Sequence, residues 1–186
     1  MADSMFCFQC EQTAQCTGCT KKVGVCGKTA DTARLQDELT GALIGLARVC
    51  RNQGKGPHSD RLILEGLFTT VTNVSFNDET IQLLIDRVNR EKAELSPGCS
   101  ACASRCGSTD NYDMQHIWNA DEDIRSLKSL LLFGLRGMAA YAYHAMVLDR
   151  SSSEVNDFFY KALCALAEEH TMEELLALNM ELGKVN

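Results

Sequence analysis

The sequence lacks several features that would place it in other classes of protein. It has only 2 prolines in 186 residues, and the alternation of apolar and polar residues that is typical of strands is nearly absent. Residues 1–30 contain no apolar run bounded by a basic stretch and a small-residue cleavage site, so nothing indicates secretion. Together with 45% hydrophobic residues, these absences predict a helix-rich cytoplasmic protein that can bury a core.

Charge and hydropathy exclude two kinds of partner. The formal net charge is −7 and no long block of like charge occurs, which disfavours nucleic acid. The most apolar stretch, Leu130 to Leu148, contains Arg136 and His144, so we interpret it as a buried helix and not as a membrane span. We therefore expect no nucleic acid and no membrane as partner, and a homo-oligomer stays open.

Cysteine is abundant, and its distribution is uneven. The chain has 10 cysteines, an even number that a disulfide framework would also show. In a reducing cytosol, however, clustered cysteines are more often metal ligands than bridges. Four of them fall within the first 26 residues: Cys7, Cys10, Cys19 and Cys26. Thiolates at this spacing, with glycines between them that let the backbone turn around a small object, predict a tetrahedral-sulfur metal site or an iron–sulfur cluster.

The other six cysteines carry weaker signals. Cys16 stands three residues before Cys19 and could compete with it as a ligand. Cys50 and Cys164 lie in helical patterns, where a free cysteine is usually a small buried hydrophobe. The remaining three share the longest loop: Cys99, Cys102 and Cys106. Their spacing suits a second cluster or a zinc ion, and a cysteine-rich loop without metal is an equal alternative.

Apolar residues at helical spacing predict six helices after the cysteine-rich segment. They cover Thr32–Arg51, Ser59–Val74, Asn77–Leu95, Asn119–Leu148, Ser152–Glu169 and a last segment from Thr171 onward. Asn77 and either Ser152 or Ser153 are expected caps, Asn119 with Glu122 opens the long helix, and Thr171 with Glu174 forms a capping box. The segment from Ser96 to Asn119 is expected to be a loop.

An internal repeat organises these helices. The segment Leu43–Ala47 aligns with Leu135–Ala139, and the helices that follow come in the same order. We therefore predict an all-α fold of two packed three-helix bundles, a duplicated unit, at residues 31–97 and 118–186. A cysteine-containing loop joins the bundles, and the cysteine-rich loop of residues 1–30 precedes them.

Two glycines and a histidine inside the predicted helices carry further expectations. Glycine in a helix interior costs about 1 kcal/mol relative to alanine, so Gly45 and Gly137 predict close approach of neighbouring helices. His144, which lies between apolar and aromatic neighbours, is expected to be a satisfied core residue rather than a ligand.

The segments that contain these residues resemble a known family. FCFQCEQTA, TGC, VGVCGK, ARLQDEL and EGLFTTVTNVSF, and later DEDIRSLKSLLLFGLRGMAAYAYHAMVL and LNMELGKVN, are similar to the N-terminal helical domain of hybrid cluster proteins, also called prismane proteins or hydroxylamine reductases. The resemblance implies that Cys7, Cys10, Cys19 and Cys26 hold a 4Fe–4S cluster or, as in one subgroup, a 2Fe–2S cluster. The spacing from Cys10 to Cys19 resembles the 4Fe–4S type, which we favour, although the spacing from Cys19 to Cys26 is one residue longer than usual.

The same resemblance limits the expected function. Members of the family continue into two further domains that bind the hybrid cluster, the site where hydroxylamine or nitric oxide is reduced, and no residue here corresponds to those ligands. We therefore expect an electron-transfer domain that serves the missing hybrid-cluster domains or a redox partner protein, and that is inactive alone. It would be a fragment, a split subunit or a small relative. The alternative is a non-redox zinc-binding structural or interaction module.

Overall fold

The computed structural model describes residues 5–10, 17–72, 74–96 and 110–186. Within this part of the chain it contains helices only, apart from an isolated bridge between Cys7 and Cys19. The helices are α1 Ala30–Gln53, α2 Ser59–Thr69, α3 Asp78–Leu95, α4 Gln115–Trp118, α5 Glu122–Val147, α6 Ser153–Leu166 and α7 Met172–Val185. The all-α prediction is confirmed.

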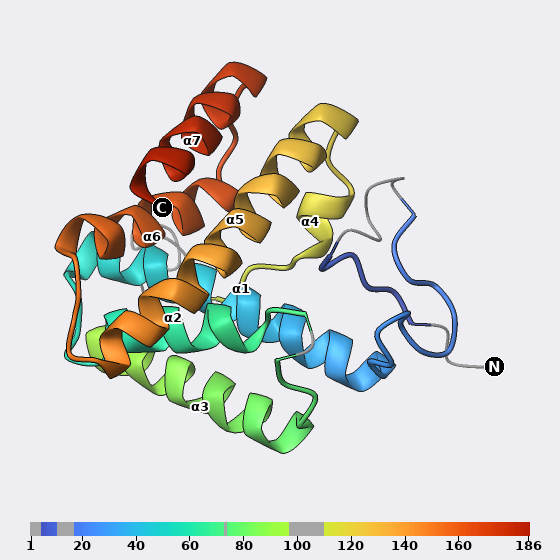
Figure 1. Cartoon of the computed structure of the whole chain (residues 1–186), viewed down its shortest axis with the longest axis horizontal. Coiled ribbons are helices and arrows are strands. Elements are labelled where there is room, and N and C mark those ends of the chain that lie inside the picture. The colour runs from blue at the N-terminus through green and yellow to red at the C-terminus, as the bar shows by residue number, and fades with distance from the viewer. Residues whose placement is uncertain (1–4, 11–16, 73, 97–109) are drawn as a thin grey trace.

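The helices pack in two groups around one core. α1, α2 and α3 contact one another, as do α5, α6 and α7, and contacts from α1 to α6 and from α2 to α5 join the groups (Figure 1). Leu39, Leu43, Leu135 and Leu163 are fully buried in a single apolar cluster that spans both groups. The division into two three-helix bundles and their origin from a duplicated unit stay predictions, because α2 contacts α5, and α6 contacts α1, more extensively than either contacts the helices of its own group.

Most of the predicted helix starts are in place. Asn77 accepts a hydrogen bond from the Thr80 amide at 2.8 Å, and Ser152 caps α6 in the same way. Thr171 and Glu174 form the predicted capping box at the start of α7. These side chains satisfy amides that the first helical turn leaves without a backbone acceptor, which is why the caps could be recognised in the sequence.

The start of the long helix was predicted wrongly. α5 begins at Glu122 after Asp121, and Asn119 instead ends the short helix α4, where its amide donates to Gln115 and Ile117 carbonyls. α4 lies inside the segment that we expected to be a loop. Its Ile117 is completely buried in the core, and this tertiary contact explains a helical turn too short to be stable by itself.

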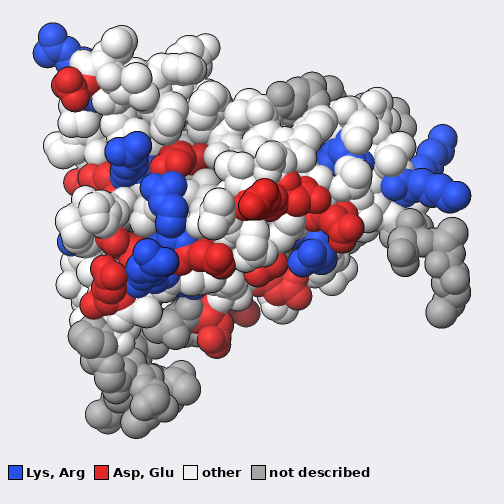
Figure 2. All heavy atoms as spheres, turned by 90° about the horizontal axis from the view of Figure 1, so that it is seen from below, with Lys and Arg blue, Asp and Glu red and all other residues white. Residues whose placement is uncertain are grey.

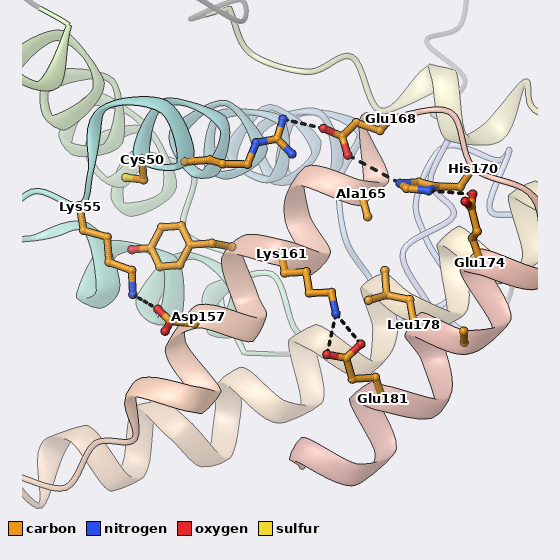
Figure 3. A pocket seen from close by; sticks show the side chains of 13 residues that line it. Cys50, Lys55, Asp157, Lys161, Ala165, Glu168, His170, Glu174, Leu178 and Glu181 are labelled. Atoms are coloured by element: carbon orange, nitrogen blue, oxygen red, sulfur yellow. Dashed lines mark hydrogen bonds and ion pairs between the residues drawn. The ribbon is translucent and has the colours of Figure 1, made fainter.

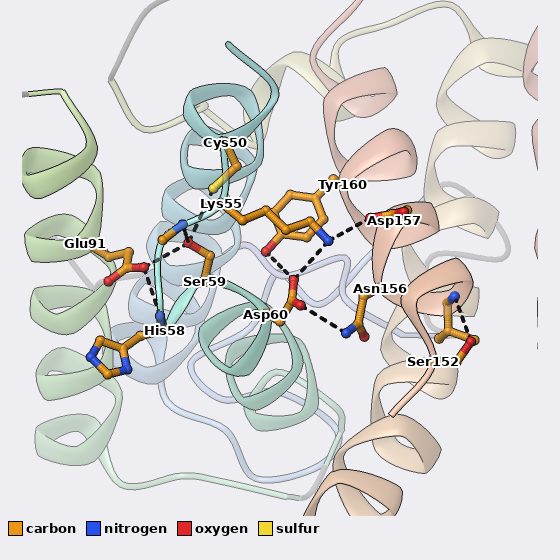
Figure 4. A network of polar contacts seen from close by, with 12 residues as sticks. Cys50, Lys55, His58, Ser59, Asp60, Glu91, Ser152, Asn156, Asp157 and Tyr160 are labelled. Carbon is orange, nitrogen blue, oxygen red and sulfur yellow. Dashed lines mark hydrogen bonds and ion pairs between the residues drawn. The ribbon is translucent and has the colours of Figure 1, made fainter. Parts of the chain in front are cut away.

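Polar contacts also join the two groups of helices (Figure 4). On α2, Asp60 accepts hydrogen bonds from the Tyr160 hydroxyl at 2.8 Å and from the Asn156 amide at 3.1 Å, both on α6. Lys55, which follows α1, pairs with Asp157 at 2.7 Å and with Asp60 at 3.2 Å. Burial and the contact with Asp60 raise the pKa of Tyr160, so its hydroxyl remains a donor.

One helix, α5, is long and apolar enough to cross a membrane by length and composition. It packs against α2, α6 and α7, and it carries the buried cations Lys128 and Arg136, so we interpret it as a core helix. The expectation for His144 was wrong, because this side chain is exposed and its ring packs edge-on against Phe68 at 5.4 Å.

The two glycines of the sequence repeat have different surroundings. A Cβ at Gly45 would lie 3.0 Å from the Asp110 carbonyl oxygen and 3.4 Å from Lys92 Nζ on α3, so the close approach there is to a non-helical segment and a lysine side chain and not, as predicted, to the backbone of a neighbouring helix. At Gly137 nothing lies within 4 Å of the same position, so the prediction was wrong for this residue. Gly41 makes the tightest approach on α1, because its missing Cβ would overlap the Tyr112 carbonyl oxygen.

This difference predicts opposite effects of the same substitution. Gly41→Ala should lower the free energy of unfolding by about 1 to 3 kcal/mol, because the added methyl group overlaps backbone. Gly137→Ala should raise it by about 0.5 to 1 kcal/mol, because alanine is the better helix former and has open space. Urea unfolding followed by circular dichroism measures both, and a loss of stability in Gly137→Ala would contradict the packing described for α5.

Candidate metal centre

Two short segments before α1 bring the first cysteines together. The Cys7 amide donates to the Cys19 carbonyl at 3.1 Å, the Cys19 amide donates back at 2.7 Å, and the Met5 amide donates to Lys21 at 3.0 Å. Gly18 lies in the left-handed region at φ 63°, and a Cβ there would approach the Cys7 carbonyl oxygen to 2.8 Å. Glycine is therefore required for the pairing of Cys7 with Cys19.

A tight turn presents the fourth cysteine. The Gly24 amide donates to the Lys28 carbonyl at 2.8 Å, and the Gly27 amide donates to Gly24 at 2.9 Å. Gly27 also has a positive φ, at 87°. The turn holds Cys26 on the side of Gly24, whose missing Cβ would lie 3.5 Å from the Cys26 sulfur.

The four predicted ligand cysteines line one cavity. Its volume is about 270 Å³, and Cys7, Cys10, Cys19 and Cys26 surround it together with Gln9, Lys28 and Thr72. All four cysteines are free thiols. Among the described residues, no three histidine, cysteine or acidic side chains are placed to hold a single metal ion. Four thiols around a common cavity are nevertheless the donor set that an iron–sulfur cluster takes.

The remaining cysteines divide in two. Cys50 and Cys164 are buried, 5% and 1% exposed, as the helical patterns predicted. Burial raises the pKa of the Cys164 thiol to about 11, which keeps it protonated and unreactive. Cys16 and the trio Cys99, Cys102 and Cys106 lie outside the described residues.

Gln9, between two of the cysteines, connects the cavity to the helices. Its side-chain amide donates to the Ala33 carbonyl at 3.1 Å and to the Asp37 carboxylate at 2.6 Å, both on α1. Its side-chain oxygen accepts from Lys28 Nζ at 2.6 Å, and its backbone carbonyl accepts from Arg136 at 3.1 Å. Every hydrogen-bonding group named here is satisfied, which fixes the turn between Cys7 and Cys10.

Two buried cations lie beside the cavity. Lys28, 3% exposed, also donates to the Gln36 side chain at 2.5 Å, and its charge opposes the rise that burial causes in the pKa of Cys7. Arg136 reaches the same turn from α5 and donates to the hydroxyls of Thr70 and Thr40 at 3.0 and 3.4 Å. Positive charge at these positions favours the thiolate form that binds metal.

A carboxyl group shares this environment. Burial raises the pKa of Asp37 to about 6, although the hydrogen bond from Gln9 and the charges of Arg136 and Lys28 act in the opposite direction. Burial likewise lowers the pKa of Arg136 to about 10, with Asp37 as the largest opposing influence. Lys28, Arg136 and Asp37 are thus joined through Gln9, which lines the cavity together with the four thiols.

Aromatic packing anchors the first cysteines from outside the helical groups. Trp118 of α4 lies 4.8 Å from the ring of Phe6, edge-on, and 5.2 Å from that of Phe8. Phe8 is 3% exposed and belongs to the main apolar cluster. Because Phe6 and Phe8 flank Cys7, this packing positions the cysteine through the core and not only through backbone hydrogen bonds.

A larger cavity, which Cys50 lines, does not include the four predicted ligand cysteines (Figure 3). It has a volume of about 610 Å³ and lies between the end of α1, α6 and α7. Its charged side chains pair with one another: Arg51 with Glu168 at 2.6 Å, Lys161 with Glu181 at 2.6 Å, and His170 with Glu174 at 3.2 Å. No predicted ligand cysteine lines it, and its paired charges do not indicate one class of ligand.

The fold and the cavity together define a helical domain with a cavity that four cysteines line. The chain matches the Prismane/CO dehydrogenase family over residues 5–186, and it belongs to this family. The resemblance noted from the sequence is thereby confirmed.

Curated relatives named hydroxylamine reductase are similar over nearly the whole chain. That of Methanocella arvoryzae is 37% identical over 98% of this chain and 38% of its own length. That of Desulfitobacterium hafniense strain Y51 is 38% identical over 97% of this chain and 37% of its own. That of Bacteroides thetaiotaomicron is 39% identical over 97% of this chain and 36% of its own length. The chain thus spans well under half the length of these relatives.

The close approach at Gly18 predicts that this residue controls metal binding. Gly18→Ala should lower the iron retained after anaerobic reconstitution several-fold, because its Cβ would push the Cys7 carbonyl away and separate Cys7 from Cys19. Gly54→Ala is the control, since Gly54 has a positive φ of 91° with nothing within 4 Å and lies outside the cavity. Iron and protein assays give the ratio, and equal retention in the two variants would contradict the role of Gly18.

The raised pKa of Asp37 predicts a pH-dependent cost in the metal-free fold. The pKa of Asp37 is about 6 in the folded protein and 3.8 ordinarily, so the ionised form of Asp37 destabilises the fold. This destabilisation is complete above about pH 6 and is absent far below about pH 4. Asp37→Asn keeps an oxygen that can accept from Gln9 and removes the charge. It should raise the free energy of unfolding by about 1 to 3 kcal/mol at about pH 8 and leave it nearly unchanged at about pH 4.

The control for this experiment is Asp31→Asn, an exposed aspartate at the start of the same helix. Urea denaturation of metal-free protein at the two pH values measures the effect. An equal gain at both values, or a gain shared by Asp31→Asn, would show that the charge of Asp37 is not responsible.

Proposed function

We propose that this chain is an iron–sulfur electron-transfer domain of the hydroxylamine reductase type, with a 4Fe–4S cluster held by Cys7, Cys10, Cys19 and Cys26. A 2Fe–2S cluster is the second possibility for the same thiolates. The observation that carries the proposal is the common cavity lined by all four cysteines. Membership of the Prismane/CO dehydrogenase family and similarity to hydroxylamine reductases support it.

Such a cluster, when bound, accepts and releases one electron at a time. The protein residues supply its surroundings. Lys28 and Arg136 place positive charge beside thiolates that together carry four negative charges, and Gln9 holds the turn between the first two ligands. Cys7 itself is 7% exposed and lies in a small apolar cluster with Met5 and Ala33. Hydrogen bonding, burial and charge of this kind are the means by which proteins set the potential of an iron–sulfur centre.

Four serine variants test the ligand assignment. Each of Cys7→Ser, Cys10→Ser, Cys19→Ser and Cys26→Ser should lower iron content and the visible absorption that dithionite bleaches, because serine replaces a thiolate ligand poorly. Cys16→Ser is the matched control within the same segment and should retain both. Iron retained in Cys19→Ser but lost in Cys16→Ser would reverse the assignment within that pair, and a colourless protein with stoichiometric zinc would overturn the proposal.

The isolated chain should not turn over hydroxylamine. If four cysteines fill the ligand positions of a cubane cluster, no iron is left open to substrate, and N–O reduction needs an open position and several electrons. A steady-state assay with reduced viologen dye, using Cys7→Ser as the cluster-free control, should therefore give the same background rate for both proteins. Turnover that depends on the cluster, and that disappears when Cys99, Cys102 and Cys106 are replaced by serine, would place an active site in that segment.

A further inference from the structure

The segment around the candidate cluster differs in charge from the rest of the chain. The chain has 25 acidic residues and a net charge of −7, yet no acidic residue occurs between Glu11 and Asp31. Lys21 and Lys22 lie in this interval, and both are exposed. The segment is therefore locally basic in an acidic protein.

Two apolar side chains are exposed directly beside the lysines. Val23 is 54% exposed and Val25 is 78% exposed. We call the surface formed by Lys21, Lys22, Val23 and Val25 the lysine–valine face. Its four residues lie within five positions of the sequence, and the two charged residues precede the two apolar ones.

The lysine–valine face adjoins the candidate cluster site through one of its residues. Val25 itself lines the 270 Å³ cavity, next to Gly24 and Cys26. At the other end, the Lys21 carbonyl accepts the Met5 amide and so continues the pairing of Cys7 with Cys19. A protein that covers this face would come close to the four cysteines.

The two lysines have no acidic partner in the described part of the chain, a property that they share with the exposed Arg90, Arg150 and Lys184. Six Lys or Arg side chains form ion pairs with acidic neighbours in the described part of the chain: Arg34, Arg51, Lys55, Arg61, Arg87 and Lys161. No such pair involves Lys21 or Lys22 there. Figure 2 shows basic atoms projecting from the end of the molecule where Figure 1 places the N-terminal segment, whereas basic and acidic atoms mix over the middle.

We propose that the lysine–valine face is the docking surface for a small acidic electron-carrier protein. This proposal rests on the proposed function and names the partner of the same site. Unpaired lysines raise the rate of encounter with a negatively charged partner, while exposed valines give a contact that excludes water. One electron leaves the reduced carrier, which is oxidised by one electron, and enters the metal centre, which is reduced by one. No proton or further reactant is needed.

Charge complementarity favours this occupant over a second copy of the chain. Two copies meeting through the same face would bring four lysines together without an acid in that segment, and like charges at an interface are costly. An acidic carrier, by contrast, gains from both lysines. Self-association is therefore an outcome that the test must separate.

The first experiment measures electron transfer from a reduced, acidic plant-type ferredoxin to the reconstituted chain by anaerobic stopped flow. The test variant is Lys21→Glu with Lys22→Glu, and the control is Arg90→Glu with Lys184→Glu, which makes the same charge change at exposed residues on α3 and α7. At low ionic strength the test variant should react about tenfold or more slowly than the wild type, and the control within about twofold. High salt should slow the wild type and remove most of this difference.

Reduction by dithionite separates failure of the docking proposal from failure of the proposed function. Equal iron content and equal reduction by dithionite in all three proteins, with equal rates from ferredoxin, would overturn the docking surface and leave the cluster assignment standing. A wild type that binds no iron would overturn the proposed function and the docking proposal together.

A second experiment needs no cluster. Calorimetry with the metal-free chain and oxidised ferredoxin should show binding that weakens about tenfold or more in the Lys21→Glu, Lys22→Glu variant and little in the control. Val23→Ser should weaken binding at both low and high salt, because an apolar contact is not screened. Sedimentation that shows a dimer of the wild type, lost in the lysine variant, would instead assign the face to a second copy.

Discussion

The hydrogen bonds of Gln9 are the constraint on which the candidate metal centre depends. The described residues before α1 form no helix and only the bridge between Cys7 and Cys19, so contacts with the rest of the molecule must place this paired segment. Gln9 makes these contacts in three directions, to Asp37 on α1, to Lys28 and to Arg136 on α5. Because it lies between Cys7 and Cys10, the position of both thiols follows from the packing of helices that are distant in sequence.

The same contacts explain why two cations are buried at one end of an acidic protein. Burying a charge is costly unless it is paired or fully hydrogen-bonded. Arg136 meets this condition through Thr70, Thr40 and the Gln9 carbonyl, and Lys28 meets it through two glutamine oxygens. Asp37 supplies a single negative charge nearby, and under the proposed function the thiolates supply the rest. Under the proposed function, Lys28 and Arg136 therefore belong to the surroundings of the cluster.

The packing of the helices sets the relative positions of the residues that make these contacts. A continuous apolar core and the contacts of Asp60 with α6 hold the two groups of helices together, so Arg136 and Asp37 keep a fixed relation although they come from different groups. Val23 and Val25, by contrast, are exposed at the surface. A buried, hydrogen-bonded interior and an exposed surface beside it are what a centre that exchanges electrons with a second protein requires.

Local rules in the sequence determined the helices and their caps, because Asn77, Ser152 and Thr171 bond to amides only three residues away. The cysteine spacing likewise identified four thiols that line one cavity. Tertiary structure alone decided the rest. Gly45 and Gly137 look alike in sequence, but only Gly45 meets a neighbouring segment, and His144 lies in an apolar helix yet faces outward. The position of Lys28 and Arg136 beside the cysteines was not predicted, because no local pattern shows that a cation is buried against a distant segment. Their role arises from residues as far as 127 positions apart that meet at Gln9, and such a meeting depends on how whole helices pack.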